Sequence, residues 1–332
     1  MGRLGWMGVD LFFVLSGFLI SRILLTQRGQ PNYFKNFYAR RALRIFPIYY
    51  AYLFIYYFAV IKLGLLVSDA SRTTEAIEVF PWLLFYGTNI FIALKGTFIV
   101  ASLNQLWTLS IEEHFYLIWP WIISKLNLRK LVFTCVGFIF LAVTTRCILL
   151  LNNVSGFTIH TFTLCRIDDF AIGALGSILL KNDSYLGFIR KNLNLFFYSL
   201  LGLLVAGSFI LQTVEAGNPW VQSIGYTILG FFFLSLILKV VTAKLESNLR
   251  FLFQAKWLRS LGKYSYALYI FQMPILVAVK RLLPGSALGR LIESPFQLAM
   301  VSSLIALMLS IIMAVISYHL FEKWFLKLKI FF

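Results

Sequence analysis

The sequence predicts an all-α protein that crosses a membrane many times as a bundle of helices. Hydrophobic residues make up 60% of the chain and charged residues only 13%, about half the charged share of a soluble domain. Apolar runs of roughly twenty residues recur, and each is long enough to cross a bilayer as a helix. No soluble domain of any size fits between these runs, so we expect a single polytopic membrane domain.

Ten apolar runs set the expected elements in chain order. They cover residues 8–26, 45–67, 80–95, 107–124, 131–151, 166–181, 194–213, 222–242, 262–283 and 297–321. The net charge is +17. In a polytopic protein this excess is typical of cytoplasmic connections facing anionic lipid headgroups, so it favours membrane lipid and not nucleic acid as the partner.

The basic residues predict how the runs cross the membrane. Most of them fall in five groups, at 22–44, 125–130, 181–191, 239–263 and in the tail after 322. Basic connections stay in the cytoplasm, and all five groups share that side only if run 80–95 does not cross. We therefore expect about nine crossings, with residues 80–105 forming a re-entrant or surface helix whose Thr88 and Asn89 line an outer cavity.

This topology leaves the N-terminus outside the membrane. The first run opens at Gly8, a few residues after Met1, which leaves no helix to carry the chain outward. We therefore expect residues 1–332 to form one membrane domain that lacks its first helix.

Two adjacent carboxylates interrupt the apolar stretch 106–120, which reads Leu-Trp-Thr-Leu-Ser-Ile-Glu-Glu-His-Phe-Tyr-Leu-Ile-Trp-Pro. An ionisable group at membrane depth is costly and usually faces the protein interior for a functional reason. Glu112 and Glu113 lie on neighbouring helical faces, and Glu113 shares its face with Tyr116. An alternative for Glu113 is structural, because Ser110-x-x-Glu113 matches a helix capping box.

Arg40, Arg41 and Arg44 lie close together after the first basic connection. Guanidinium groups hold phosphate by paired hydrogen bonds, so these residues are candidates for binding the phosphates of a nucleotide-bearing donor. The alternative is that they only orient the chain in the membrane.

Further charged residues interrupt other apolar runs. Arg166 is expected to pair with a carboxylate, either Glu112 or Asp168, whereas Arg146 has no obvious partner in the sequence. An alternative for Asp168 is structural, because an acid near a helix N-terminus is favoured by the helix dipole. An alternative for Asp10 is that it is the N-cap of the first run.

Small residues and cysteines complete the residue pattern. Ser16-Gly17 is expected to allow close helix packing and not to act as a nucleophile. Three cysteines without a C-x-x-C pair indicate neither a disulfide framework nor a metal site.

Several short motifs follow one another along nearly the whole chain. They are Gly-Val-Asp-Leu-Phe-Phe-Val-Leu-Ser-Gly-Phe at 8–18, Tyr-Ala-Arg-Arg-Ala-Leu-Arg-Ile-Phe-Pro at 38–47, Trp-Thr-Leu-Ser-Ile-Glu-Glu-His-Phe-Tyr at 107–116, Arg-Ile-Asp-Asp-Phe-Ala-Ile-Gly at 166–173, Tyr-Ser-Tyr-Ala-Leu-Tyr at 264–269 and Ser-Tyr-His-Leu-Phe-Glu at 317–322. Together these motifs resemble the bacterial membrane acyltransferase-3 family. The resemblance implies transfer of an acyl group, usually acetyl from acetyl-CoA, to a hydroxyl of a cell-surface carbohydrate. It also implies a bacterial cytoplasmic membrane.

The sequence departs from this family in two places. A catalytic histidine of the family lies on a helix upstream of Gly8, and a second frequent histidine is replaced by Gln272. The remaining candidates for catalysis are Glu112, Glu113 and Asp168, with Arg166 as an orienting charge. Motif residues expected to shape the pocket are Asp10, Ser16, Tyr116, Tyr266, Gln272 and Glu322.

Two other functions stay open at this point. A transporter or flippase-like carrier would also place polar residues along a membrane pathway, without acyl chemistry. A chain without its first helix could also fold as an inactive fragment.

Overall fold

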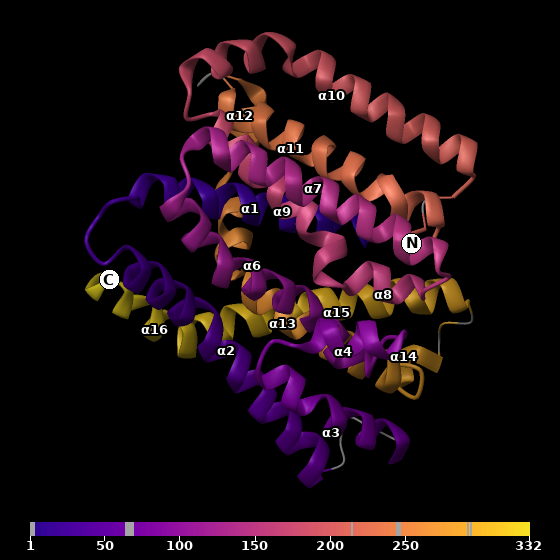
Figure 1. Cartoon of the computed structure of the whole chain (residues 1–332). Coiled ribbons are helices and arrows are strands. Elements are labelled where there is room, and N and C mark those ends of the chain that lie inside the picture. Colours follow the sequence, from indigo (N-terminus) through magenta and orange to yellow (C-terminus); the bar gives the residue numbers. More distant parts are fainter. Residues whose placement is uncertain (1–3, 64–69, 214, 244–246, 291, 293) are drawn as a thin grey trace. The chain divides into compact units, whose positions relative to one another are not determined.

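The chain folds entirely into helices in the parts that the structure describes (Figure 1). This computed structural model describes residues 4–63, 70–213, 215–243, 247–290, 292 and 294–332. None of these residues lies in a strand, which confirms the predicted all-α class.

The helices follow one another with short connections. Their bounds are α1 Met7–Gln27, α2 Tyr33–Leu63, α3 Ala70–Leu84, α4 Thr88–Lys95, α5 Ala101–Asn104, α6 Leu106–Lys125, α7 Leu128–Leu151, α8 Gly156–Thr161, α9 Thr163–Leu179, α10 Asp183–Leu211, η1 Val221–Gly225, α11 Tyr226–Thr242, α12 Asn248–Phe253, α13 Lys256–Leu282, α14 Ala287–Arg290, α15 Pro295–Ser317, η2 Tyr318–Glu322, α16 Lys323–Lys327 and η3 Leu328–Phe331.

Six helical segments of the described chain are long and apolar enough to cross a membrane. They are Met7–Gln27, Tyr33–Ala59, Leu128–Leu151, Tyr185–Leu211, Val221–Thr242 and Pro295–Phe331. The number of crossings expected from the charge pattern, about nine, stays a prediction.

Residues 80–105 do not form one continuous helix. Helix α3 ends at Leu84, and Tyr86 two residues later takes a positive φ of 53°. Helix α4 ends at Lys95 and is capped by Gly96, whose φ is 71°. Asn89 is fully buried and donates to the Thr161 carbonyl and the Thr163 hydroxyl. Asn89 therefore anchors α4 to the α8–α9 segment, and the predicted re-entrant path stays a prediction.

The chain divides into two compact units. Unit 1 contains residues 1–33, 86–97 and 107–253, and unit 2 contains residues 34–85, 98–106 and 254–332.

Helix α1 forms the centre of unit 1. It packs against α9 and α11, while α9 also packs against α7, and α10 lies along α11 (Figure 1). Gly17 of α1 faces the Phe170 backbone so closely that a Cβ atom would clash with its carbonyl, and Gly173 of α9 faces the Val14 carbonyl in the same way. The close packing predicted for Ser16-Gly17 is confirmed for Gly17.

An aromatic row links three helices of unit 1. The ring of Phe13 stacks on Phe170 with centroids 4.7 Å apart, and Phe170 lies 4.7 Å from Phe115. Phe115 in turn stacks on Trp119 at 5.1 Å. Stacked rings of this kind bury large apolar areas, so the row fixes α6 against α1 and α9.

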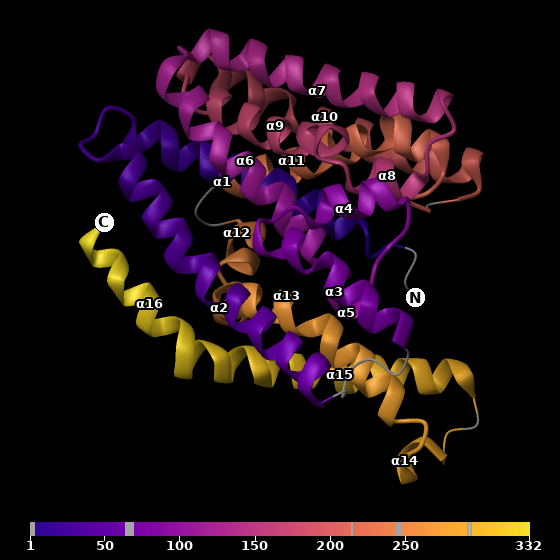
Figure 2. The ribbon, with the colours of Figure 1, turned by 60° about the horizontal axis from the view of Figure 1, so that its bottom comes forward.

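Tyrosine hydroxyls tie the helices of unit 2 together. Tyr49 of α2 donates to the Leu83 carbonyl at 2.8 Å, and Tyr52 donates to the Ser102 carbonyl at 2.8 Å. Helices α13 and α15 run side by side (Figure 2). Buried tyrosine needs such partners for its hydroxyl, and these bonds connect α2 with α3 and α5.

Candidate active site

Three residues of unit 1 form an acid–hydroxyl cluster, which consists of Ser16, Glu112 and Tyr116. The Ser16 hydroxyl donates to Glu112 Oε1 at 2.8 Å and lies 2.6 Å from the Tyr116 hydroxyl. Tyr116 also donates to Glu112 Oε1. Only 6% of Glu112 is exposed. A buried carboxylate that accepts hydrogen bonds from hydroxyl groups is suited to take a proton from a hydroxyl.

The helix that carries this carboxylate begins earlier than a capping box requires. Helix α6 starts at Leu106, so Ser110 lies inside the helix, where the preceding turn already supplies the backbone acceptors. The capping-box interpretation of Ser110 and Glu113 is therefore wrong. Glu113 is half-buried on the face next to that of Glu112.

Five charged residues form a second group in unit 1, the buried charge network, which consists of Asp10, Arg146, Arg166, Asp168 and Asp169. Arg166 pairs with Asp10 at 2.7 Å and with Asp169 at 2.9 Å. Arg146 pairs with Asp168 at 2.9 Å. All five side chains have an exposed fraction of 0%. Buried charges require such pairing, because an isolated ion in the interior costs several kcal/mol, in rough terms.

Neutral groups complete the surroundings of Arg146. It donates to the Cys165 carbonyl at 2.5 Å, to the Ser223 carbonyl at 3.1 Å and to the Thr227 hydroxyl at 2.6 Å. Thr227 in turn donates to Asp168 Oδ2 at 2.6 Å. Arg146 therefore joins α7, α9 and α11 through one side chain.

An aromatic wall covers the other arginine. The Arg166 guanidinium lies 4.2 Å from the centre of the Tyr226 ring and 5.7 Å from that of Phe13. The Tyr226 hydroxyl is 2.9 Å from His160 Nδ1. Burial, together with the positive charge of Arg166, lowers the pKa of His160 to about 3, so this imidazole is neutral at physiological pH.

Glycine makes room for the network on α11. A Cβ atom at Gly230 would lie 2.8 Å from Asp169 Oδ1, so only glycine lets α11 pack over this carboxylate without displacing it.

The structure corrects the partners expected for these charges. Arg166 pairs with Asp10 and Asp169, and not with Glu112 or Asp168. Asp10 is not an N-cap, since α1 begins at Met7, and Asp168 is not a cap, since α9 begins at Thr163. Both helices begin before these acids: Asp10 is the fourth residue of α1, and Asp168 is the sixth residue of α9. The acids are thereby left facing the interior, where the arginines pair with them.

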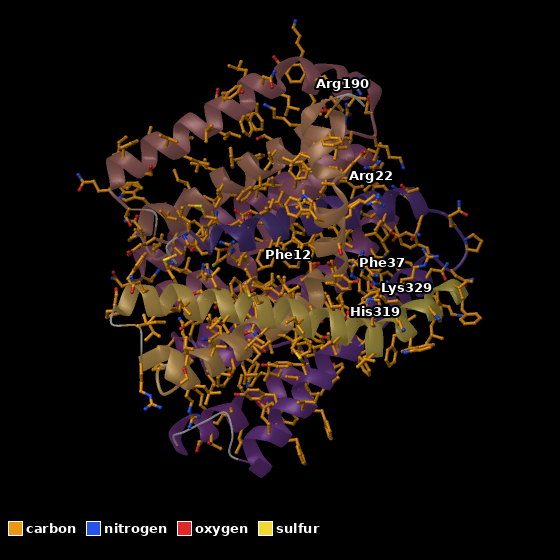
Figure 3. The ribbon with its side chains drawn as sticks, turned by 180° about the vertical axis from the view of Figure 1, so that it is seen from behind. Phe12, Arg22, Phe37, Arg190, His319 and Lys329 are labelled. Carbon is orange, nitrogen blue, oxygen red and sulfur yellow. The ribbon has the colours of Figure 1, made fainter. Side chains whose placement is uncertain are left out.

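The candidate donor-binding residues lie in unit 2 on α2. Arg40 and Arg44 are exposed, and half-buried Arg41 lies 5.9 Å from the centre of the Phe37 ring. Lys329 of η3 lies close enough to all three arginines to feel their charge; Phe37 and Lys329 are labelled in Figure 3. The sequence alone does not place Lys329 beside these arginines, because it lies almost three hundred residues away in the chain.

The remaining predicted pocket residues also lie in unit 2. Tyr266 donates to the Ile45 carbonyl at 3.1 Å, so it fastens α13 to the helix of the candidate donor-binding arginines. Glu322 is buried in η2, where it accepts from Ser317 at 3.2 Å and feels the charge of Arg44. Gln272 is exposed on α13.

Comparison with known proteins identifies sequence relatives. A model of the acyltransferase-3 family, described as an acyltransferase domain, matches residues 3–319. The chain is 29% identical to peptidoglycan O-acetyltransferase OatA of Listeria monocytogenes over 82% of its length and 45% of the relative. It is 25% identical to O-acetyltransferase OatA of Staphylococcus aureus over 96% of its length and 52% of the relative. The chain thus spans about half the length of these curated relatives. No solved structure matches it.

Proposed function

Because the chain belongs to the acyltransferase-3 family, we propose that it is an integral-membrane O-acyltransferase. It moves an acyl group, most simply acetyl, from acyl-CoA to a hydroxyl of a carbohydrate in the bacterial cell envelope. The name of its Listeria monocytogenes relative, which refers to O-acetylation of peptidoglycan, supports cell-wall carbohydrate as the acceptor. The six apolar helical segments long enough to span a bilayer support a place in the membrane, for which we propose the bacterial cytoplasmic membrane.

The observation that carries the chemistry is the hydrogen bonding of Glu112. Attack of a hydroxyl on a thioester requires a base for the hydroxyl proton. In the proposed step the acceptor oxygen bonds to the acyl carbon while Glu112 takes the proton. The carbon–sulfur bond then breaks, and the proton passes from Glu112 to the departing CoA sulfur. The acceptor hydroxyl would replace Ser16 as the donor to Glu112 Oε1.

The same cluster also contains a hydrogen-bond donor that can stabilise the negative charge developing during this step. A tetrahedral intermediate carries negative charge on the former carbonyl oxygen, and positioned hydroxyl donors stabilise such an oxyanion. Tyr116 lies one helical turn from Glu112 and within 2.6 Å of Ser16. We assign it this role, with Ser16 positioning its hydroxyl.

The buried charge network has a different role in this proposal. Asp168 is enclosed by Arg146 and Thr227, and proton transfer to it would disrupt an ion pair with no exposure to solvent. Arg166 is engaged in the same way by Asp10 and Asp169. We therefore propose that Asp168 and Arg166 hold α7, α9 and α11 on α1, and that Glu112 is the stronger candidate for the base, with Glu113 second.

Donor binding falls to the arginines of α2. Arg40, Arg41 and Arg44, together with Lys329, concentrate positive charge in one region of unit 2. The phosphates of CoA match this charge, and a guanidinium can hold a phosphate through two hydrogen bonds. No further cofactor enters the proposed reaction.

Transfer of label tests the proposed function. Membranes containing the chain are given acetyl-CoA labelled in the acetyl group and a soluble peptidoglycan fragment as acceptor. We expect labelled ester on the fragment that mild alkali releases. The control is Glu78→Gln, which alters an exposed carboxylate of α3 and should match the parent. Absence of labelled ester with folded protein, across a range of carbohydrate acceptors, would contradict the proposal.

A further inference from the structure

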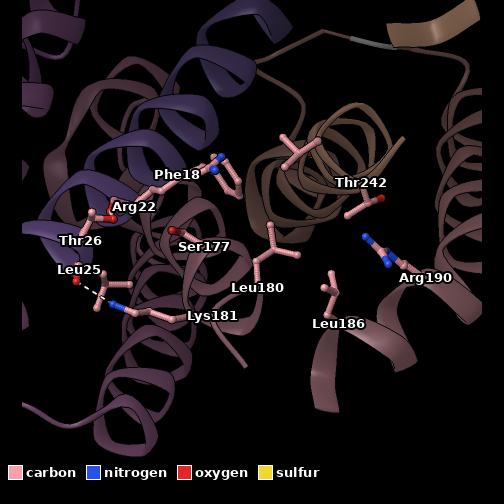
Figure 4. Close-up of a pocket in the computed structure, with 11 residues that line it drawn as sticks. Phe18, Arg22, Leu25, Thr26, Ser177, Leu180, Lys181, Leu186, Arg190 and Thr242 are labelled. Carbon is pink, nitrogen blue, oxygen red and sulfur yellow. Dashed lines mark hydrogen bonds between the residues drawn. The ribbon is translucent and has the colours of Figure 1, made fainter. Parts of the chain in front are cut away.

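Unit 1 contains a second cation-rich site, formed by residues other than the candidate donor-binding arginines of unit 2. A cavity of about 350 Å³ lies between α1, α9, α10 and α11 (Figure 4). We call it the basic pocket, and its polar lining consists of Arg22, Thr26, Ser177, Lys181, Arg190 and Thr242. Its volume falls within the range typical of small-molecule sites.

The cations of the basic pocket have no counter-charge among the side chains that the structure describes. Lys181 Nζ donates to the Leu25 carbonyl at 2.7 Å (dashed in Figure 4), which fixes the ammonium at the end of α1. The guanidinium groups of Arg22 and Arg190 make no hydrogen bond or ion pair with any described residue, and no described lining residue is acidic. Like charges that line one cavity repel one another, and a bound anion relieves that repulsion.

A buried hydroxyl also lacks a partner at this site. Ser177 of α9 is 5% exposed and makes no side-chain hydrogen bond within the described part of the chain. A hydroxyl on the cavity wall without a protein partner can form a hydrogen bond with a ligand oxygen that enters. Guanidinium, ammonium and hydroxyl groups are all donors that bind phosphate oxygens, and this one cavity is lined by all three kinds.

The rest of the wall indicates that the ligand has an apolar part. Phe18, Leu180 and Leu186 line the same cavity. A ligand with a phosphate head and an apolar body would satisfy both surfaces, since apolar contact and charged hydrogen bonds would form together.

Two separate segments of the sequence supply the charges. Arg22 opens the first basic connection, while Lys181 and Arg190 belong to the third; Arg22 and Arg190 are both labelled in Figure 3. The charge pattern predicts the cytoplasmic side for both connections. Orientation alone does not require the two groups to line one cavity, as they do here.

We propose that the basic pocket binds the phosphate group of an amphipathic phosphate ester. Two cytoplasmic sources share this chemistry: the headgroup of an anionic phospholipid and the phosphates of CoA. Only the CoA source rests on the proposed acyl transfer; the phospholipid source does not.

Binding to the full chain in phosphatidylcholine nanodiscs tests the proposal without any acyl transfer. One arm measures binding of labelled CoA, and the other measures retention of added phosphatidylglycerol by native mass spectrometry. The variant Arg22→Gln/Arg190→Gln removes both free guanidinium groups. Since each charged hydrogen bond contributes strongly to affinity, we expect at least a roughly tenfold loss for one probe.

The matched control is Arg129→Gln, which removes an exposed arginine at the start of α7 and should leave both probes bound as in the parent. Loss of CoA alone or of both probes assigns the pocket to CoA phosphates, and loss of phosphatidylglycerol alone assigns it to lipid. Parental binding of both probes by the double variant overturns the proposal.

A second variant covers the case in which the charge variant does not fold. Leu186→Trp fills the cavity from α10 and leaves all three cations in place. It should weaken binding of at least one of the two probes. Parental binding of both probes by this variant also overturns the proposal. Binding without transfer in the labelled-acetyl assay would contradict the proposed function alone, so the two failures are distinguishable.

Discussion

Two polar groups in unit 1 use their carboxylates in different ways. In the acid–hydroxyl cluster, Glu112 accepts hydrogen bonds from the neutral hydroxyls of Ser16 and Tyr116. In the buried charge network, Asp10, Asp168 and Asp169 face the guanidinium groups of two arginines. A hydroxyl partner can be exchanged for a substrate hydroxyl, whereas removal of an arginine partner leaves a buried charge uncompensated. We therefore propose that the first group carries the chemistry and that the second stabilises the fold.

The largest expected effect follows from breaking the buried charge network. In Arg146→Met, Asp168 would be left fully buried beside Thr227. Removing one member of a buried ion pair costs about 3–5 kcal/mol, so we expect little folded protein in membranes and early thermal aggregation in detergent. Size-exclusion profiles of heated samples would show the loss. A folded Arg146→Met protein with parental thermal stability would contradict the claim that the buried charge network stabilises the fold.

Close packing of α1 and α9 provides a second test of what stabilises unit 1. Gly173→Ala places a methyl group against the Val14 carbonyl, whereas Gly137→Ala on α7 meets nothing within 4 Å. Overpacking of this kind costs about 1–3 kcal/mol. We expect the first substitution to lower the thermal midpoint by several degrees and the second to leave it unchanged. Equal midpoints for the two variants would show that the helices can separate without cost.

A smaller effect concerns donor binding in unit 2. Arg44→Lys keeps the charge but loses paired contacts to a phosphate. Loss of one charged hydrogen bond, about 1.5 kcal/mol, should raise KM for acyl-CoA by roughly tenfold with little change in kcat. Steady-state kinetics would measure both constants, with Arg129→Gln as the control. A parental KM would mean that Arg44 only orients the chain.

The sequence predicted the helical class and most helices because apolar length is a local property. The runs near 131–151 and 222–242 coincide with α7 and α11 to within a few residues. Helix starts were less predictable, because α6 begins at Leu106 and α9 at Thr163, several residues before the acids that the sequence suggests as caps.

Pairing among distant charges could not be predicted from the sequence. Asp10 and Arg166 are separated by 156 positions, and Arg146 and Asp168 by 22. Composition shows only that each buried charge needs a partner. Which partner it finds depends on helix rotation and on close approach at Gly17 and Gly173, and neither is visible in one sequence. Glu112 was a candidate from its membrane depth alone, while its contact with Ser16 emerged only from the fold.

Turnover per folded molecule in Glu112→Gln tests the central claim most directly. The amide keeps the size of the side chain and its carbonyl can still accept from Ser16, but it cannot take a proton at neutral pH. We predict parental thermal stability and a loss of acetyl transfer of about 10²–10⁴-fold, while Glu113→Gln loses less and Glu78→Gln loses nothing. A folded Glu112→Gln protein that transfers acetyl at the parental rate would contradict the account, because Glu112 could then not be the base.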